Sequence, residues 1–238
     1  MKIPALQLLS DVSRKGCAAL RRALPGLRPG TQLPVAGRFQ PYNHTLPNRY
    51  PWLFEFTRAC LHDAQDLCIL SFGCSRGDEV FALRDYFPTA AIKGIDIDPG
   101  NISDCRARAL TGRDSDMTFA VAATTRAEKS ASYDAIFCLA VLCHGDLSTY
   151  GAKRSDPLMH FEEFERTVAD FSRCLKPGGL LLLHTTNFRF CDTAAFKDFD
   201  TVLEADPAHM ASDVLFGRDN RLMEGEQYRA VAFRKRRR

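Results

Sequence analysis

A five-residue turn with a glycine at each end separates two apolar segments of the chain. The turn GCSRG, residues 73–77, follows the apolar residues 67–72, and a second apolar run ends at Asp96, 19 residues after Gly77. Between a strand and a helix, such a turn brings backbone N–H groups and the positive helix end close to a ligand, while an acidic residue at the tip of the next strand binds ribose hydroxyls. The pattern therefore predicts a nucleotide site in an α/β domain.

The spacing and charge of the turn indicate which nucleotide. A dinucleotide site needs GxGxxG, whereas this chain has GxxxG with Ser75 in the middle. Asp78 and Glu79 follow at once, in the first turn of the predicted helix. Two acids there suit the helix dipole but repel a diphosphate, and they favour a ligand that carries an ammonium and a sulfonium group. S-adenosylmethionine is such a ligand.

Four segments, in this order, resemble motifs of the class I S-adenosylmethionine-dependent methyltransferases: LSFGCSRGDE, GIDID, YDAIFCLAVLCH and LKPGGLLLLHTTN. They cover roughly residues 67–187. The resemblance implies S-adenosylmethionine as the cofactor and a Rossmann-like α/β fold, doubly wound around a mostly parallel seven-stranded sheet with helices on both faces. The glycine turn alone is also similar to that of the chemotaxis receptor methyltransferases.

Length and local composition predict one catalytic domain with an N-terminal extension. We assign residues 52–238 to the methyltransferase domain and residues 1–51 to a basic amphipathic helix, near 5–24, followed by an extended arm. The arm is rich in Pro, Gly and Asn, and its segment QPYNHTLPNRYPW gathers polar and aromatic side chains. A plain linker has little use for them, so we interpret the arm as a lid.

Apolar periodicity predicts the order of strands and helices within the domain. Asp98 and Pro99 predict a helix start, with Asp98 as the cap. The predicted strands are 67–72, 91–96, 117–122, 134–139 and 180–185, followed by a terminal antiparallel pair, 214–216 with 228–233. The predicted helices are 52–67, 78–87, 99–110, one after Pro157 with apolar residues from Phe161 to Leu175, and one containing Phe196 and Val202.

Charge and cysteine content indicate which partners and which cellular location suit the protein. The net charge is +3, but residues 1–30 carry six Lys or Arg and the five residues 234–238 are all basic. These ends are either solvated tails or contacts for RNA, a membrane surface or an acidic partner. The nine cysteines include no CxxC pair, and no apolar stretch approaches the roughly 20 residues of a membrane span, so we predict a cytoplasmic protein without a bound metal.

The resemblance assigns a set of residues to the cofactor. Asp96 would bind the two ribose hydroxyls, Ile97 would flank the adenine, and Leu139 would contact the methionine part. The full predicted set is Gly73, Ser75, Gly77, Asp96, Ile97 and Leu139. Where the family often has an acidic residue after the third strand, this chain has Ala122 and Ala123.

The methyl acceptor would lie where the fourth and fifth strands end. His144 opens a polar stretch after strand four and is the predicted catalytic base, with a solvated loop histidine as the alternative. Asn187 follows strand five and is predicted to contact the acceptor. Arg49 and Tyr50 are predicted to close over the acceptor or the cofactor carboxylate, with ordinary packing of the arm as the alternative.

These observations lead to one main hypothesis and three others. The main one is transfer of a methyl group to an O or N atom of a small molecule. An RNA methyltransferase that uses the basic ends and a non-catalytic binder of adenosyl ligands stay open, and a nicotinamide dehydrogenase fits the glycine spacing poorly. The sequence does not indicate the acceptor or the oligomeric state.

Overall fold

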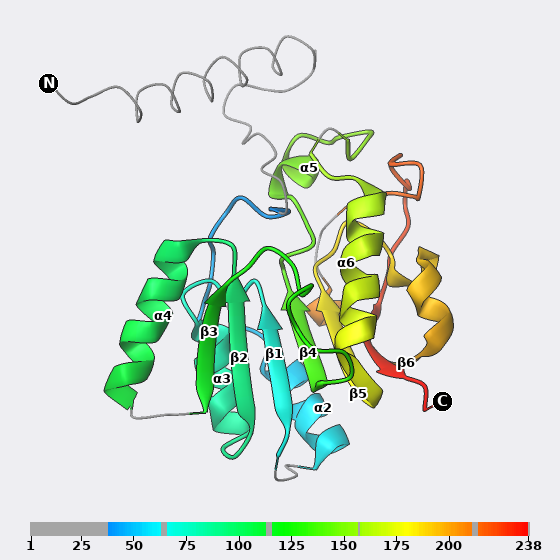
Figure 1. The fold of residues 1–238 in the computed structure, drawn as a ribbon. Helices are drawn as coiled ribbons and strands as arrows, with labels where there is room; N and C mark the ends of the chain where they lie inside the picture. Colours follow the sequence, from blue (N-terminus) through cyan, green and yellow to red (C-terminus); the bar gives the residue numbers. More distant parts are fainter. Residues whose placement is uncertain (1–37, 63–65, 113–115, 157, 211–213, 238) are drawn as a thin grey trace, which may run out of the picture.

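The described part of the chain forms a seven-stranded sheet in the order β3-β2-β1-β4-β5-β7-β6 (Figure 1). We describe a computed structural model that covers residues 38–62, 66–112, 116–156, 158–210 and 214–237. Neighbouring strands from β3 to β5 are parallel, and β7 is antiparallel to both β5 and β6. The strands are β1 (Cys68–Phe72), β2 (Ala91–Asp96), β3 (Met117–Val121), β4 (Tyr133–Leu139), β5 (Leu175–His184), β6 (Phe199–Glu204) and β7 (Ala230–Lys235).

Alternating side chains of the central strands build one core on each face of the sheet. Leu70 and Phe72 of β1 belong to one buried cluster, whereas Ile69 belongs to the other. The same alternation separates Phe137 of β4 from its neighbour Cys138. Because successive side chains of a strand point to opposite faces, central strands with two apolar faces require a cover on both.

Helices supply both covers. Among the described residues, the helices are α2 (Pro51–Leu61), α3 (Asp78–Tyr86), α4 (Pro99–Gly112), α5 (Gly145–Thr149) and α6 (Phe161–Cys174). The described 3-10 turns are η1 (Phe190–Asp192), η2 (Ala194–Asp198) and η3 (Pro207–His209). Buried residues of α2, α3 and α4 share one cluster and those of α6 the other. Figure 1 shows α6 in front of the sheet and α2 and α3 behind it. The predicted doubly wound α/β fold is confirmed.

The terminal antiparallel pair exists, but it uses a different partner from the predicted one. β7 pairs with β6, and Phe199 lies opposite Lys235. The predicted partner, residues 214–216, makes only an isolated bridge from Phe216 to Leu222. The predicted helix containing Phe196 and Val202 is a 3-10 turn only as far as Asp198, and β6 follows it. Two apolar residues are too few to distinguish a helix from an edge strand that buries Phe199.

Two other predicted boundaries are wrong. The helix before β1 ends at Leu61 rather than near residue 67, because His62 adopts a left-handed backbone with φ 56° and its N–H donates to Arg58 O at 2.9 Å. Strand β5 begins at Leu175, earlier than predicted. Asp98 caps α4 as predicted, since its Oδ1 accepts from the N–H groups of Gly100 and Asn101 at 2.8 and 3.2 Å.

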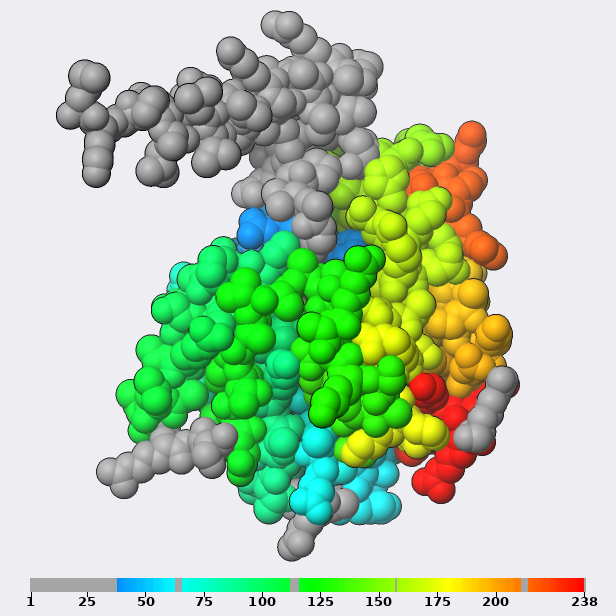
Figure 2. Space-filling model, in the orientation of Figure 1, coloured from blue at the N-terminus to red at the C-terminus, as the bar shows by residue number. Residues whose placement is uncertain are grey.

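Residues 38–50 are the described part of the predicted arm and are called the arm from here on. They run as an irregular segment over the strand ends. Figure 2 shows part of the arm, in blue, at the surface above the carboxyl ends of the strands. The predicted basic helix near residues 5–24 lies outside the described residues. Among the described helices, none is long and apolar enough to cross a membrane.

Replacing Phe171 by alanine should test the packing of α6 on the sheet. Phe171 is fully buried, and its ring packs edge-on against that of Phe72 with 4.9 Å between the ring centroids. We expect Phe171→Ala to lower the free energy of unfolding by about 3–5 kcal/mol, measured by urea titration. Arg166→Ala, at an exposed site of the same helix, should change it by less than about 0.5 kcal/mol. Equal changes in the free energy of unfolding for the two substitutions would contradict the packing of Phe171 on the sheet.

Candidate functional site

A cavity lies at the carboxyl ends of β1, β2 and β4, beneath the arm. Below the arm, three loops supply much of the lining: the glycine turn at 73–75, residues 96–98 around the end of β2, and residues 139–141 around the end of β4. The other lining residues on this side are Phe54, Phe72, Glu79, Asn101, Ala122 and Ala123. Residues 38–46, Arg49 and Tyr50 of the arm line the opposite side. Ligand sites of open parallel sheets lie at this edge, so the cavity is where the topology predicts a site.

The glycine turn has a backbone that most residues adopt only with strain. The φ angle is 73° at Gly73, 50° at Ser75 and 88° at Gly77. A Cβ atom on Gly73 would lie 2.5 Å from Val141 Cγ2, so the approach of the β4 loop also requires glycine there. In this backbone the Ser75 N–H points back to Asp96 and donates to Oδ2 at 2.8 Å.

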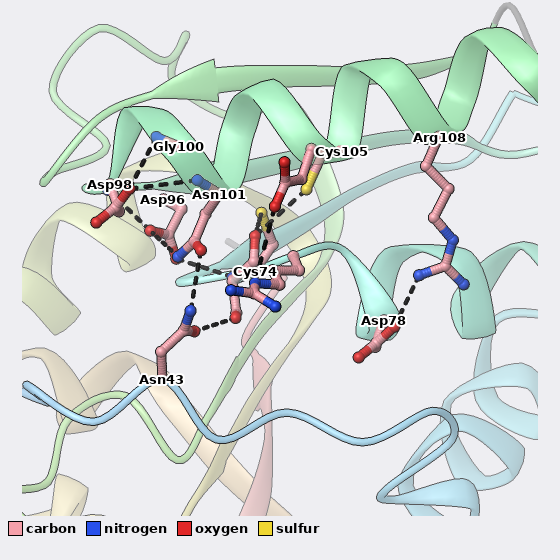
Figure 3. A network of polar contacts seen from close by, with 12 residues as sticks. Asn43, Cys74, Asp78, Asp96, Asp98, Gly100, Asn101, Cys105 and Arg108 are labelled. Carbon is pink, nitrogen blue, oxygen red and sulfur yellow. Dashed lines mark hydrogen bonds and ion pairs between the residues drawn. The ribbon is translucent and has the colours of Figure 1, made fainter.

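Asp96 connects three segments of the cavity wall and is 8% exposed. Its Oδ2 accepts from the N–H of Ser75, and its Oδ1 accepts from the N–H of Asp98 at 2.8 Å and from Asn101 Nδ2 at 3.1 Å (Figure 3). The carboxylate therefore holds the glycine turn, the end of β2 and the start of α4 together beside the cavity.

A carboxylate and a guanidinium of opposite charge line the same cavity. Glu79 Oε1 accepts a hydrogen bond from Ser71 Oγ at 2.7 Å. Burial raises the pKa of Glu79 to about 7, although that hydrogen bond and the charge of Arg49 both lower it. A further cation beside Glu79 would favour its ionised form. The site can thus hold a ligand group with a positive charge near Glu79 and a negative charge near Arg49.

Tyr42 of the arm and Asp146 of α5 form a hydrogen-bonded pair. The Tyr42 hydroxyl donates to Asp146 Oδ1 at 2.5 Å, and Tyr42 lines the cavity. This bond, together with burial, raises the pKa of Tyr42 to about 12. Asp146 is 3% exposed, and its Oδ2 has no hydrogen-bond partner among the described residues. A buried carboxylate oxygen without a donor is a place where a proton or donor can be accommodated.

Tyr50 is positioned by a histidine at the end of β5. The rings of Tyr50 and His184 lie 4.9 Å apart. His184 Nε2 lies 2.9 Å from the carbonyl oxygen of His209, which only accepts, so Nε2 carries the proton and Nδ1 accepts from Thr185 Oγ1 at 2.8 Å. Burial lowers the pKa of His184. Neutral His184 is therefore a fixed packing partner that keeps Tyr50 at the cavity.

The predicted residues His144 and Asn187 contact each other beside the cavity. The His144 N–H donates to Asn187 Oδ1 at 2.7 Å, and its Nδ1 accepts from the Asp146 N–H at 3.3 Å. Asn187 Nδ2 donates to Val214 O at 2.8 Å. The residues are 3% and 0% exposed, and neither is among the described residues that line the cavity. Their predicted roles stay predictions.

Most of the remaining predicted residues line the cavity. Gly73, Ser75, Asp96, Ile97 and Leu139 all line the cavity, as do Arg49 and Tyr50, Ala122 and Ala123. Gly77 lies behind them, as the residue before α3. Across residues 38–237, leaving aside the gaps named above, no group of three His, Cys, Asp or Glu side chains is arranged to hold a metal ion.

Sequence reasoning did not single out Asp146 or Asn101. Both follow a strand end closely, Asp146 by seven residues after Leu139 and Asn101 by five after Asp96. That placement is a usable signal, because side chains just after parallel strands collect at one edge of the sheet. It does not tell which of several polar residues turns toward the site.

Comparison with known proteins identifies the central part of the chain. Residues 70–181 match a family model described as a methyltransferase domain. Similar solved structures include phosphoethanolamine N-methyltransferase 2 of Haemonchus contortus (16% identity, 59% of this chain, 29% of that chain, TM-score 0.44). A second is a geranyl diphosphate C-methyltransferase of Streptomyces coelicolor (18% identity, 56% of this chain, 44% of that chain, TM-score 0.41). A third is a putative sarcosine dimethylglycine methyltransferase of Galdieria sulphuraria (17% identity, 56% of this chain, 43% of that chain, TM-score 0.43).

The chain spans less than two thirds of the length of these solved proteins. No curated protein sequence is similar enough to count as a match. The matched residues 70–181 contain the glycine turn, Asp96, and β4 and most of β5, and the sheet around them has the predicted strand directions. The central residues 70–181 thus match a methyltransferase domain, and they contain the motifs that resemble those of the class I S-adenosylmethionine-dependent methyltransferases.

Proposed function

We propose that the protein binds S-adenosylmethionine in the cavity under the arm and transfers its methyl group to an O or N atom of a small molecule. The observation that carries this proposal is the charge pattern of the cavity. Asp96 lies at the end of β2, while Glu79 and Arg49 line the same cavity and offer opposite charges to one ligand. A nucleoside with an amino-acid tail matches all three groups.

The residues fit the parts of such a cofactor one by one. Asp96 accepts from a ribose hydroxyl, Glu79 faces the ammonium group and Arg49 faces the carboxylate of the methionine tail. Ile97 flanks the adenine, and the backbone around Ala122 and Ala123 serves its amino group. A side chain at residue 73 would clash with Val141, so the turn beneath the methionine tail keeps a glycine there.

The bound cofactor supplies an electrophilic methyl group on a positively charged sulfur. The protein then needs mainly to hold the acceptor in line, and correct alignment can provide roughly 7–11 kcal/mol of the barrier reduction. Tyr50, held by His184, and the arm residues around Tyr42 form the side of the cavity that an acceptor would contact. Asn187, behind them, fixes the His144 backbone through its amide.

Two groups can accept the proton that an acceptor hydroxyl or ammonium loses. Tyr42 lines the cavity and can pass its own proton to Asp146 while it takes one from the acceptor. His144 is the alternative base, and its Nδ1 lone pair is already used by the Asp146 N–H. The geometry favours Tyr42 with Asp146, because Tyr42 has direct access to the cavity.

A small acceptor suits the covered cavity better than RNA does. Several basic groups at the C-terminal end are already engaged in the fold. Lys235 Nζ donates to Ser172 O and Leu175 O at 2.6 and 3.0 Å, and Arg236 pairs with Asp200 at 2.8 Å. These side chains are less available to phosphates than a free basic tail would be. The non-catalytic alternative fails if any methylated product is detected.

Replacing Asp96 should weaken cofactor binding. We expect Asp96→Ala to weaken S-adenosylhomocysteine binding roughly 10–100-fold, since hydrogen bonds to a charged group contribute about 1.5–3 kcal/mol. Calorimetric titration measures this, with NAD as a ligand that should not bind. Asp104→Ala, at an exposed acid of α4, is the matched control and should leave affinity unchanged. Retained tight binding by folded Asp96→Ala would overturn the assigned site.

The raised pKa of Glu79 should make cofactor affinity depend on pH. The ammonium group needs ionised Glu79, and a pKa of about 7 in the free protein leaves this group mostly protonated at pH 6. Affinity for S-adenosylhomocysteine should therefore rise roughly eightfold from pH 6 to pH 7.5. Glu79→Gln should abolish this rise. The ligand 5′-methylthioadenosine, which has no ammonium group, should show a flat profile, and a parallel rise for it would contradict the role of Glu79.

Replacing Tyr42 should slow methyl transfer without loss of cofactor binding. With an acceptor found by screening amines and alcohols against a labelled methyl donor, Tyr42→Phe should lower kcat roughly 100-fold or more. Its affinity for S-adenosylhomocysteine should stay within about twofold. Tyr86→Phe is the matched control and should be fully active. If Tyr42→Phe is active and His144→Gln is not, then His144 is the base.

A further inference from the structure

Asp96 alone has too few free acceptor positions for both hydroxyls of a ribose. A carboxylate offers about four lone-pair positions. Three are occupied by the donors from Ser75, Asp98 and Asn101 described above. One position is left for a ribose hydroxyl, while the ribose of an adenosyl ligand presents two adjacent hydroxyls. The second hydroxyl needs another partner at the same place.

Asn43 of the arm lies in the same hydrogen-bond network. Its Nδ2 donates to Asn101 Oδ1 at 2.9 Å, and its Oδ1 accepts from Ser75 Oγ. Figure 3 shows the Asn43 side chain reaching from the arm toward the start of α4, next to Asp96. Asn43, Asn101 and Asp96 all line the cavity. An amide oxygen has a second lone pair and an amide nitrogen a second hydrogen, so Asn43 can still accept and donate one bond each.

We propose that Asn43 is a cofactor-binding residue, whose side-chain amide binds one ribose hydroxyl of the adenosyl ligand while Asp96 binds the other. This inference rests on the proposed function and assigns a nucleoside contact to the arm. A ligand with both hydroxyls joins the arm to the end of β2. The arm thereby binds the ribose in addition to covering the cavity.

Contacts on both sides of Asn43 hold it at this position. Arg38 forms an ion pair with Asp98 at 3.8 Å, and Tyr42 is bonded to Asp146. Asn43 is therefore presented to the site before a ligand arrives, and ordering it costs little on binding. The competing explanation is that Asn43 only fastens the arm to α4, in which case its loss would weaken every ligand equally.

A comparison of ligands that differ by one hydroxyl separates these explanations. Calorimetry would measure the binding of 5′-methylthioadenosine and of its 2′-deoxy and 3′-deoxy analogues to the full chain. The variant is Asn43→Ala. The control is Asn48→Gly on the same arm, because Asn48 is not among the cavity-lining residues and its φ of 49° suits glycine. Thermal unfolding confirms that each variant is folded.

The wild-type protein should bind both deoxy analogues roughly fivefold to tenfold more weakly than the parent ligand. In Asn43→Ala, the affinity difference between the parent ligand and one deoxy analogue should shrink to less than about twofold. The difference for the other analogue, which lacks the hydroxyl that Asp96 binds, should persist. Asn48→Gly should behave as wild type. Equal weakening of all three ligands by Asn43→Ala would overturn the inference. Failure of folded wild-type protein to bind any of the three would instead overturn the proposed function on which it rests.

Discussion

The hydrogen bonds of Asp96 are the constraint on which the site depends. One carboxylate joins the glycine turn, the end of β2 and the first turn of α4, which are separate in the sequence. Without it, the Ser75 N–H would lose its acceptor in a left-handed backbone, which is strained for a non-glycine residue. The same carboxylate is the group expected to meet the ribose, so the support of the turn and the recognition of the ligand share one side chain.

The arm turns this open strand edge into a covered cavity. It contributes a cation at Arg49, aromatic hydroxyls at Tyr42 and Tyr50, and the amide of Asn43. The sheet contributes the acids Asp96 and Glu79. The proposed ligand carries a ribose, an ammonium and a carboxylate, and it would satisfy both sides at once.

Prediction from sequence succeeded where a pattern is local and repeated. Residues Phe161, Phe164, Val168 and Phe171 recur at helical spacing, and α6 buries that stripe. Strand β2 and the cap at Asp98 follow from similarly local signals. Prediction failed at β6, because an edge strand buries few residues and its partner β7 is distant in the sequence. The centroid of the Phe190 ring lies 5.2 Å from that of Phe199 in β6 and 4.8 Å from that of Phe233 in β7, so a shared aromatic cluster joins the two strands.

The sequence by itself determined the glycine turn, the acid that ends β2 and the alternation of strands and helices, because each depends on residues close together in the chain. Tertiary structure decided which polar side chains share the cavity. Only the folded chain brings Tyr42 to Asp146 and Asn43 to Asn101, and only it places His144 and Asn187 behind the cavity wall. The reason is physical: hydrogen bonds between distant segments depend on the relative placement of elements, which local periodicity does not encode.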